Sequence, residues 1–331
     1  MQCPQCKSLK SLLEHVAKED PRLACDIIRE LGGLPLALNQ AGAYLEETSE
    51  SLSTYLTLYY ERQTELLQRR GGLISDHAPV ATTWFLAFQS IELIDPLAIE
   101  LIHLYAFLAP DAIPEELLTE TAHLLNPTLQ SLATNQTRFN DAIKALLTYS
   151  LIQRDRATRT LSIHRLVQAV IKSEMNKTRQ AHWAERIVRI ISHLFPFDEV
   201  APWTRSQRYF SHALLAVEYI SQWSFTFAEA RALPNRLGTY FRSRGQYNEA
   251  EPLHQRALAI DEKHLGPNHP DTASSLNNLA VLYSDQGKYE QAESLHQRAL
   301  AIREQRLGPD HPKTAKSRKQ YAQFREKMEA K

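Results

Sequence analysis

Long apolar runs, cysteines and a surplus of charge of either sign are all scarce in this chain of 331 residues. No apolar run approaches the roughly 20 residues that a membrane-spanning helix needs. The first residues, MQCPQCKSLKSLL, also lack the apolar core of a signal peptide. We therefore predict a cytoplasmic protein that contacts no membrane.

The charge balance argues against nucleic acid as a partner. The chain carries 38 basic and 38 acidic side chains, so its formal net charge is zero. A protein that binds nucleic acid through counterion release normally has a basic surplus. We therefore predict no nucleic-acid partner.

The three cysteines do not make a convincing chemical site. Cys3 and Cys6 have the spacing of half a zinc site or of a redox pair, but structural zinc needs four ligands. Cys25 and His15 are poorly spaced to complete it. We interpret the Cys3–Cys6 segment as a non-functional terminus in a reducing compartment, without disulfides.

No catalytic arrangement stands out either. The sequence shows no nucleophile motif paired with histidine and acid. Adjacent acidic residues, such as Glu115-Glu116 and Glu46-Glu47, lie in helical polar surroundings, and we interpret them as solvated helix faces. We therefore expect no enzyme activity from this chain alone, unless a nucleotide-binding core is supplied separately.

An internal repeat is the strongest signal in the sequence. Residues 245–273 and 287–315 are offset by 42 residues, and about two-thirds of their positions are identical. The strings HQRALAI and LG-P-HP-TA recur whole. Four histidines recur at this period, which indicates packing or turn roles rather than metal ligation: His254, His269, His296 and His311.

Each repeat has the pattern of a helix pair. We predict first helices over 235–244 and 276–286, ended by Gly245 and Gly287 at C-cap positions. Pro270 and Pro312 are interpreted as connections between units. The second helix has apolar residues at spacings of three, four and seven, one face of an α-helix: Ala250, Leu253, Ala257, Leu258 and Leu265. Stacked pairs of this kind form a solenoid with a concave groove.

The unit resembles the tetratricopeptide repeat in its 42-residue variety. That family keeps a small residue and an aromatic on the first helix, matched by Gly238 with Phe241 and by Ala280 with Tyr283. Residues 318–331 look like a further first helix. The resemblance implies that the groove binds a protein or peptide.

Five polar residues on the first helices are the predicted partner contacts: Asn235, Arg242, Asn277, Asn278 and Lys319. An asparagine at such a position can bind a peptide backbone through both amide groups. The alternative is that the asparagines form hydrogen bonds only within the repeats. The sequence gives no indication of an oligomeric state.

A second resemblance lies ahead of the repeats. The string LGGLPLALNQAGAYLEET, residues 31–48, predicts a helix end at Gly32-Gly33 and a new helix that starts near Pro35. It resembles the G-L-P-L-A motif of NB-ARC signalling ATPases. That resemblance implies that Pro35, with Leu34 and Leu36 beside it, packs near the adenine of ADP.

The segment SLIQRDRATRTLSIHRLVQAVI predicts a short β-hairpin and then a helix that begins near His164. It resembles the winged-helix subdomain of the same ATPases, in which a histidine of an M-H-D motif faces the β-phosphate of ADP. His164 is retained here, with Ile163 and Arg165 as different neighbours. The basic segment from Arg154 to Arg159 also allows a weaker interpretation, nucleic-acid binding through the wing.

The departure from that family is as informative as the match. Its nucleotide core needs a phosphate-binding loop, G-x-x-x-x-G-K-[ST]. The Gly-Lys pair of this chain, Gly287-Lys288, lies inside a repeat. The sequence therefore establishes no cofactor by itself, and ADP is the cofactor that the resemblance implies.

The predicted fold class is mainly α, with a helical bundle, a winged helix with a small β-hairpin, and a repeat solenoid. The domains are an N-terminal remnant of a nucleotide core (1–21), an ARC-like helical subdomain (22–75), a winged-helix-like domain (76–176), bridging helical pairs (177–234) and tetratricopeptide repeats (235–331). We predict a protein-interaction scaffold derived from a signalling ATPase. The alternative is a nucleotide switch that acts with a separate core.

Overall fold

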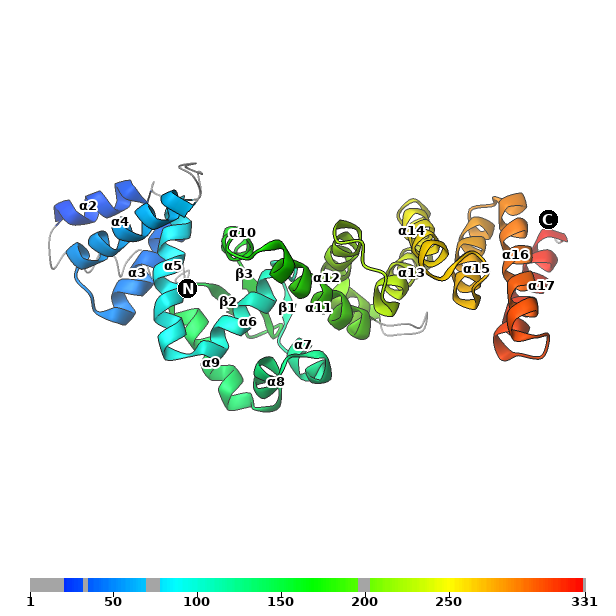
Figure 1. The fold of residues 1–331 in the computed structure, drawn as a ribbon, viewed down its shortest axis with the longest axis horizontal. Coiled ribbons are helices and arrows are strands. Elements are labelled where there is room, and N and C mark those ends of the chain that lie inside the picture. Colours follow the sequence, from blue (N-terminus) through cyan, green and yellow to red (C-terminus); the bar gives the residue numbers. More distant parts are fainter. Residues whose placement is uncertain (1–20, 32–34, 70–77, 196–202, 330–331) are drawn as a thin grey trace. The chain divides into compact units, whose positions relative to one another are not determined.

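The computed structural model describes residues 21–31, 35–69, 78–195 and 203–329 (Figure 1). Some predictions therefore lie outside the described residues: those on the nucleotide-core remnant before residue 21, on Cys3 and Cys6, and on Gly32, Gly33 and Leu34. The chain divides into two compact units, Met1–Trp183 and Ala184–Lys331. The finer domain boundaries stay predictions.

The first unit opens with four helices, namely α2 (Pro21–Glu30), α3 (Pro35–Thr48), α4 (Leu52–Arg69) and α5 (Ala78–Ile94). Helix α5 packs against both α3 and α4. Four apolar residues at helical spacing on α3 are buried: Ala37, Leu38, Ala41 and Leu45. The prediction of a helix that starts at Pro35 is confirmed.

Five more α-helices and a short 3₁₀ turn follow in the same unit. They are α6 (Pro96–Ala106), α7 (Leu117–Glu120), the turn Ala122–Leu124, α8 (Pro127–Thr134), α9 (Gln136–Thr148) and α10 (Arg165–Ser173). Side-chain caps fix several of their starts: Asp95 accepts from the backbone N–H of Leu97 at 3.0 Å, and Asn126 accepts from that of Leu129 at 2.9 Å.

A small antiparallel sheet lies among these helices. The predicted hairpin is present as β2 (Ile152–Asp155) and β3 (Thr160–Ile163). A third strand, β1 (Ile113–Pro114), pairs with β3 and was not predicted, because two residues are too short to show an alternating pattern. The helix after the hairpin is α10, with His164 as its N-cap, as predicted.

One buried glutamine ties α10 to the end of α6. The side-chain amide of Gln168 donates to the backbone carbonyls of Tyr105 at 3.0 Å and Leu108 at 2.9 Å. Carbonyls at a helix end have no partner within their own helix. Gln168 therefore joins α10 to the last turn of α6 and to the residues that follow it.

Helix α11 (Lys177–Leu194) begins in the first unit and ends in the second. The second unit continues with α12 (Trp203–Gln222), α13 (Ala228–Ser243), α14 (Tyr247–Leu265), α15 (Pro270–Asp285), α16 (Tyr289–Leu307) and α17 (Pro312–Glu329). Apolar residues at helical spacing on α11 are buried, namely Trp183, Ile187, Ile190, Ile191 and Leu194, whereas Leu214 of α12 is 37% exposed.

The first helices of the repeats begin earlier than predicted. Helix α15 starts at Pro270 and α17 at Pro312, so these prolines are first helical residues and not parts of the connections. Proline suits that place because its missing N–H would have no helical partner there. Helix α13 likewise begins at Ala228, seven residues before the predicted 235.

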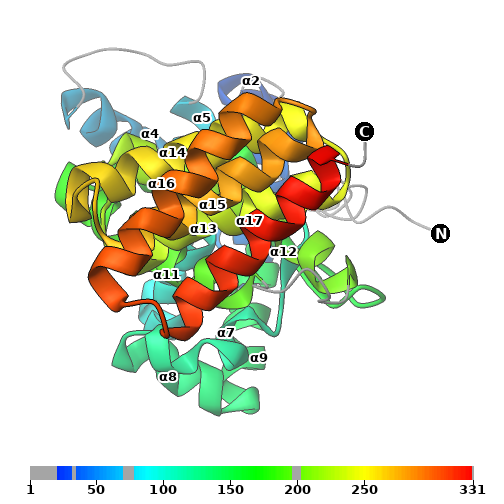
Figure 2. The same ribbon diagram turned by 90° about the vertical axis from the view of Figure 1, so that its right-hand side faces the viewer.

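The ends of the first helices are as predicted. Gly245 and Gly287 follow α13 and α15 with φ of 72° and 78°, a left-handed conformation that glycine adopts without strain. Figure 2 shows the helices of the repeats stacked behind one another, with α13, α15 and α17 in one row and α14 and α16 beside them. The architecture is a mainly α chain that ends in a helical solenoid.

Among the described helices, none combines the length and the apolar character that crossing a bilayer requires.

Candidate partner-binding site

A chain of polar side chains crosses the first repeat. His254 Nδ1 on α14 lies 3.0 Å from Asn235 Oδ1 on α13, and the Asn235 amide donates to Ser275 Oγ on α15 at 2.7 Å. Ser275 in turn donates to Asp261 Oδ2 at 2.6 Å. We call His254, Asn235, Ser275 and Asp261 the first ladder. It joins both helices of one repeat to the first helix of the next.

The second repeat carries the same arrangement. His296 Nδ1 lies 3.0 Å from Asn277 Oδ1, and the Asn277 amide donates to Ser317 Oγ at 2.6 Å. The Arg303 guanidinium, in the place of Asp261, donates to Ser317 Oγ and, at 2.8 Å, to Ser274 Oγ. We call His296, Asn277, Ser317 and Arg303 the second ladder. The recurring histidines on the second helices are thus packing residues.

The other two recurring histidines are helix caps. His269 Nδ1 accepts from the backbone N–H of Asp271, and His311 Nδ1 from that of Lys313, both at 3.1 Å. The prediction that the four histidines belong to packing or turns is therefore confirmed.

The ladder histidines are held neutral. Burial lowers the pKa of His254 to about 4, with a further contribution from the positive charge of Arg242. Burial alone lowers the pKa of His296 to about 4. A neutral ring that donates from Nδ1 to asparagine leaves Nε2 without a proton. Because His254 Nε2 has no hydrogen-bond partner among the described residues, a second proton there would be buried and unpaired.

The small residue on the first helix makes room for the histidine. A Cβ added at Gly238 would lie 2.8 Å from His254 Nε2 and 2.9 Å from Cε1. No real Cβ tolerates such distances, so the ring requires glycine there. The corresponding residue of the next repeat, Ala280, is fully buried.

The structure places the predicted contact residues in three different situations. Asn235 and Asn277 belong to the ladders, and Asn277 is only 3% exposed, so their amides are used inside the solenoid. Arg242 forms an ion pair with Asp285 at 2.9 Å. Lys319 is exposed, and Asn278 is half-buried with no hydrogen bond among the described residues. Asn278 and Lys319 are thus the two predicted contact residues that lie outside these interactions.

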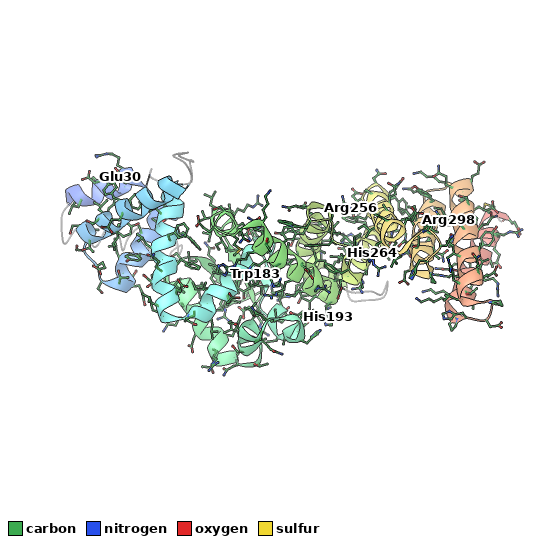
Figure 3. All side chains as sticks on the ribbon, in the orientation of Figure 1. Glu30, Trp183, His193, Arg256, His264 and Arg298 are labelled. Carbon is green, nitrogen blue, oxygen red and sulfur yellow. The ribbon has the colours of Figure 1, made fainter. Side chains whose placement is uncertain are left out.

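Further ion pairs join successive repeats. Arg298 of α16, labelled in Figure 3, lies 2.7 Å from Glu262 of α14. Lys288 contacts Glu251 at 3.0 Å, and the pKa of that carboxyl is lowered by Lys288 against an opposing effect of burial. These pairs are partly exposed, so each adds little to stability. They orient side chains on the surface of the solenoid.

The two residues predicted for ADP lie in exposed places. Pro35 is the exposed first residue of α3, and the exposed His164 accepts from the backbone N–H of Leu166 at 3.2 Å as the N-cap of α10. No interaction between Pro35 and His164 is seen in the described part of the chain. The ADP site stays a prediction.

One acidic residue differs from its interpretation. Glu115, taken as part of a solvated face, is 7% exposed, and both its oxygens accept from Arg154 at 2.6 and 2.7 Å. A lone sequence gives no signal for a bidentate pair between residues 39 positions apart. The pair also removes Arg154 from the basic surface that the weaker nucleic-acid interpretation invoked.

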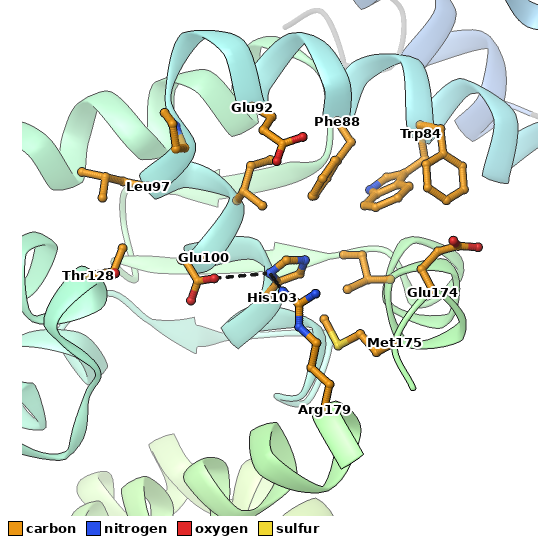
Figure 4. Close-up of a pocket in the computed structure, with 14 residues that line it drawn as sticks. Trp84, Phe88, Glu92, Leu97, Glu100, His103, Thr128, Glu174, Met175 and Arg179 are labelled. Atoms are coloured by element: carbon orange, nitrogen blue, oxygen red, sulfur yellow. Dashed lines mark hydrogen bonds and ion pairs between the residues drawn. The ribbon is translucent and has the colours of Figure 1, made fainter. Parts of the chain in front are cut away.

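The first unit holds a pocket of about 420 Å³ between α5, α6 and the start of α11. Figure 4 shows Trp84 and Phe88 along one side of the pocket and Glu100, His103, Met175 and Arg179 along the opposite side. His103 Nδ1 lies 3.9 Å from Glu100 Oε1 and 3.5 Å from Arg179 Nη2. The pocket has the size and mixed lining of a small-molecule site.

Two family models match the chain. One, described as the tetratricopeptide repeat, matches residues 229–305 and 283–329. The other, described as a domain of unknown function (DUF7779), matches residues 89–180. The solenoid of the second unit therefore contains tetratricopeptide repeats.

Among curated proteins, the chain is similar to a nucleotide-binding leucine-rich repeat (NLR)-like protein of Hyaloscypha variabilis (strain UAMH 11265 / GT02V1 / F), with 30% identity over 265 residues. The match covers 76% of this chain and 25% of that protein, so the chain spans a quarter of the length of this relative. Among solved structures, the crystal structure of BtubC (BKLC) from P. vanneervenii shares 16% identity, with a TM-score of 0.30 over 64% of this chain and 89% of that one. A likeness at that score supports no argument.

Proposed function

We propose that the tetratricopeptide repeats bind a segment of a protein partner, and that the chain is the sensing part of a signalling protein related to NB-ARC ATPases. The observation that supports this most is the pair of ladders. They fix the register of α13, α15 and α17 through buried hydrogen bonds, which gives a preorganised surface rather than a flexible array.

The contacts that we propose are Asn278 and Lys319. Asn278 lies on α15 and Lys319 on α17, one repeat period after Asn277, and neither takes part in a ladder. An amide and an ammonium group at these places suit the backbone carbonyls and carboxylates of an extended or helical segment. Asn277, by contrast, is a scaffold residue, so its replacement tests stability and not recognition.

Affinity capture with the whole chain tests the proposal. Wild-type chain and the Asn278→Ala/Lys319→Ala variant serve as baits, and Lys316→Ala removes a neighbouring exposed cation of α17 as the matched control. We expect a protein that is retained by wild type and by Lys316→Ala and is lost with the double variant. Equal retention by all three would contradict the assigned surface.

A nucleotide switch is the second candidate, and the NLR-like relative is the observation that favours it. Under it, ADP would bind through Pro35 and His164. Calorimetry with ADP tests this, with His311→Ala as the matched control for His164→Ala because both histidines cap a helix through Nδ1. ADP binding lost only with His164→Ala supports the switch. The absence of any binding heat when ADP is added to the wild-type chain would contradict the nucleotide-switch proposal.

We also propose that the chain alone does not hydrolyse ATP. The support is chemical: phosphoryl transfer needs a phosphate-binding loop and an acidic magnesium ligand placed together, and the sequence has no G-x-x-x-x-G-K-[ST] string. Turnover of ATP by the purified chain that persists in controls for contaminating ATPases would overturn this proposal.

A further inference from the structure

The pocket between α5, α6 and the start of α11 has a buried hydrogen-bond donor on its aromatic side. Trp84 lines the pocket and is 2% exposed, and its Nε1–H has no hydrogen-bond partner among the described residues. An unpaired N–H that is shielded from water opposes folding, and native proteins hold few of them. A ligand with an acceptor atom would give this N–H the partner that the described chain does not provide.

The surroundings of Trp84 suit a flat, apolar ligand. The Phe88 ring lies beside the indole, with the ring centroids 4.6 Å apart. Phe88 is half-buried, so it is the side chain that can turn to let an acceptor reach the N–H. Aromatic rings pack well against a lining of this kind. The buried apolar residues of the lining are Phe85, Ile99, Ile171 and Met175.

Glu100 lies on the opposite side of the pocket and is held in place from two directions (Figure 4). Its Oε2 accepts from the side-chain amide of Asn126 at 3.1 Å, and its Oε1 lies 3.9 Å from His103 Nδ1. The interaction with His103 lowers the pKa of Glu100 against an opposing effect of burial, so the group is an ionised acceptor at neutral pH. A carboxylate has about four acceptor positions. Glu100 can therefore accept from a ligand N–H in addition to these partners.

We propose that this pocket binds a small, neutral, flat aromatic amide, whose carbonyl accepts from Trp84 Nε1–H and whose N–H donates to Glu100. The two groups lie on opposite sides of the pocket, and the carbonyl and the N–H of a trans amide point in opposite directions. The carboxylates of Glu92, Glu100 and Glu174 disfavour an anionic ligand, and Arg179 offsets only part of their charge. A cation without an acceptor would leave the Trp84 N–H unpaired.

Three probes of similar size separate the two hydrogen bonds. N-methylbenzamide has both the carbonyl and the N–H, methyl benzoate lacks the N–H, and N-methylbenzylamine is a cation without the carbonyl. Their affinities for the whole chain are measured at pH 7.5 from the indole N–H resonances of nitrogen-15-labelled protein. We expect N-methylbenzamide to bind with a Kd of about 1 mM, at least about fivefold tighter than either analogue. It should also shift the Trp84 resonance, which is identified by its loss in Trp84→Phe.

Two variants with matched controls test the two residues. Trp84→Phe keeps an aromatic ring and removes the N–H, and Glu100→Gln removes the charge, so each should weaken N-methylbenzamide binding at least about fivefold. Tyr105→Phe deletes another buried group that has no partner among the described residues, and Glu46→Gln removes an exposed carboxylate. Both controls lie outside the pocket lining and should bind within about twofold of wild type.

Four results would overturn the proposal. They are no binding of N-methylbenzamide at about tenfold the expected Kd, an analogue that binds as tightly as the amide, a Trp84 resonance that does not move, or equal losses in a variant and its control. The comparison of the three probes needs only the wild-type chain, so it decides the matter even if Trp84→Phe does not fold. Because the pocket lies in the first unit and Asn278 and Lys319 lie in the second, failure here is distinguishable from failure of the partner-binding proposal.

Discussion

The two repeats build the same ladder but end it with opposite charges. In the first, Asp261 accepts a hydrogen bond from Ser275, and in the second, Arg303 donates one to Ser317. A serine hydroxyl can donate or accept, so it adapts to either partner. The hydrogen bonds among histidine, asparagine and serine are therefore common to both repeats and set the register of the helices. The fourth ladder residue can have either charge.

The repeats also differ in how deeply the ladder lies. Asn235 is half-buried, whereas Asn277 is 3% exposed and its amide donates to Gln320 at 3.2 Å as well as to Ser317. The ladder should therefore contribute more to the free energy of unfolding in the second repeat than in the first.

The largest expected effect is on the response of both ladders to acid. The pKa of each ladder histidine is about 4, below the ordinary value of 6.5, so the unfolded chain takes up protons first as the pH falls. The stability present above pH 6.5 is lost between about pH 6.5 and 4, on the order of 3 kcal/mol for each histidine. Urea unfolding at several pH values measures it.

The same experiment separates the two repeats. Arg242→Gln removes the charge that contributes to the low pKa of His254 and leaves His296 without change. In a titration of this variant followed by nuclear magnetic resonance, only the pKa of His254 should differ from wild type. A free energy of unfolding that changes by less than about 1 kcal/mol from pH 7.5 to 4.5 would contradict the neutral, buried histidines.

The next effect is that of the ladder amides. Asn277→Ala leaves the Nδ1–H of His296 buried without its acceptor and should lower the free energy of unfolding by about 2–4 kcal/mol. Asn235→Ala, at a half-buried place, should cost about 1–2 kcal/mol. Asn278→Ala is the matched control and should stay within about 0.5 kcal/mol of wild type. Equal losses for Asn277→Ala and Asn278→Ala would refute the ladder assignment.

The smallest effect concerns the residue under the histidine. Gly238→Ala gains helix propensity but drives a Cβ into the His254 ring, so we expect a net loss of about 1–2 kcal/mol. Ala280→Gly should cost about 1 kcal/mol through propensity and a lost contact. Thermal unfolding compares the two. A Gly238→Ala variant more stable than wild type would show that the ring moves freely.

Much of the fold could be predicted because it repeats or alternates. The 42-residue period fixed the helix pairs, and Gly245 and Gly287 marked the ends of the first helices. The hairpin and the helix after His164 followed from their residue pattern. Helix starts were placed too late because the polar residues that follow Pro270 and Pro312 resemble a loop as much as a first helical turn.

The structural features that were not predicted depend on contacts between residues distant in sequence. Nothing local shows that Glu115 meets Arg154, or that β1 pairs with β3. Asn277 and Asn278 are adjacent and chemically identical, yet Asn277 is inside the ladder and the half-buried Asn278 is not part of it. Helical periodicity places them on different faces, but which face the next repeat covers is decided by tertiary packing.

The most direct test of the account is the affinity of a captured partner for three purified chains, measured by calorimetry at pH 7.5. We predict that Asn278→Ala/Lys319→Ala weakens binding at least tenfold with an unchanged unfolding midpoint, and that Asp261→Asn lowers the midpoint but binds like wild type at 10 °C. Unchanged affinity in the double variant, or affinity that follows the midpoint in both, would contradict a preformed recognition surface on the repeats.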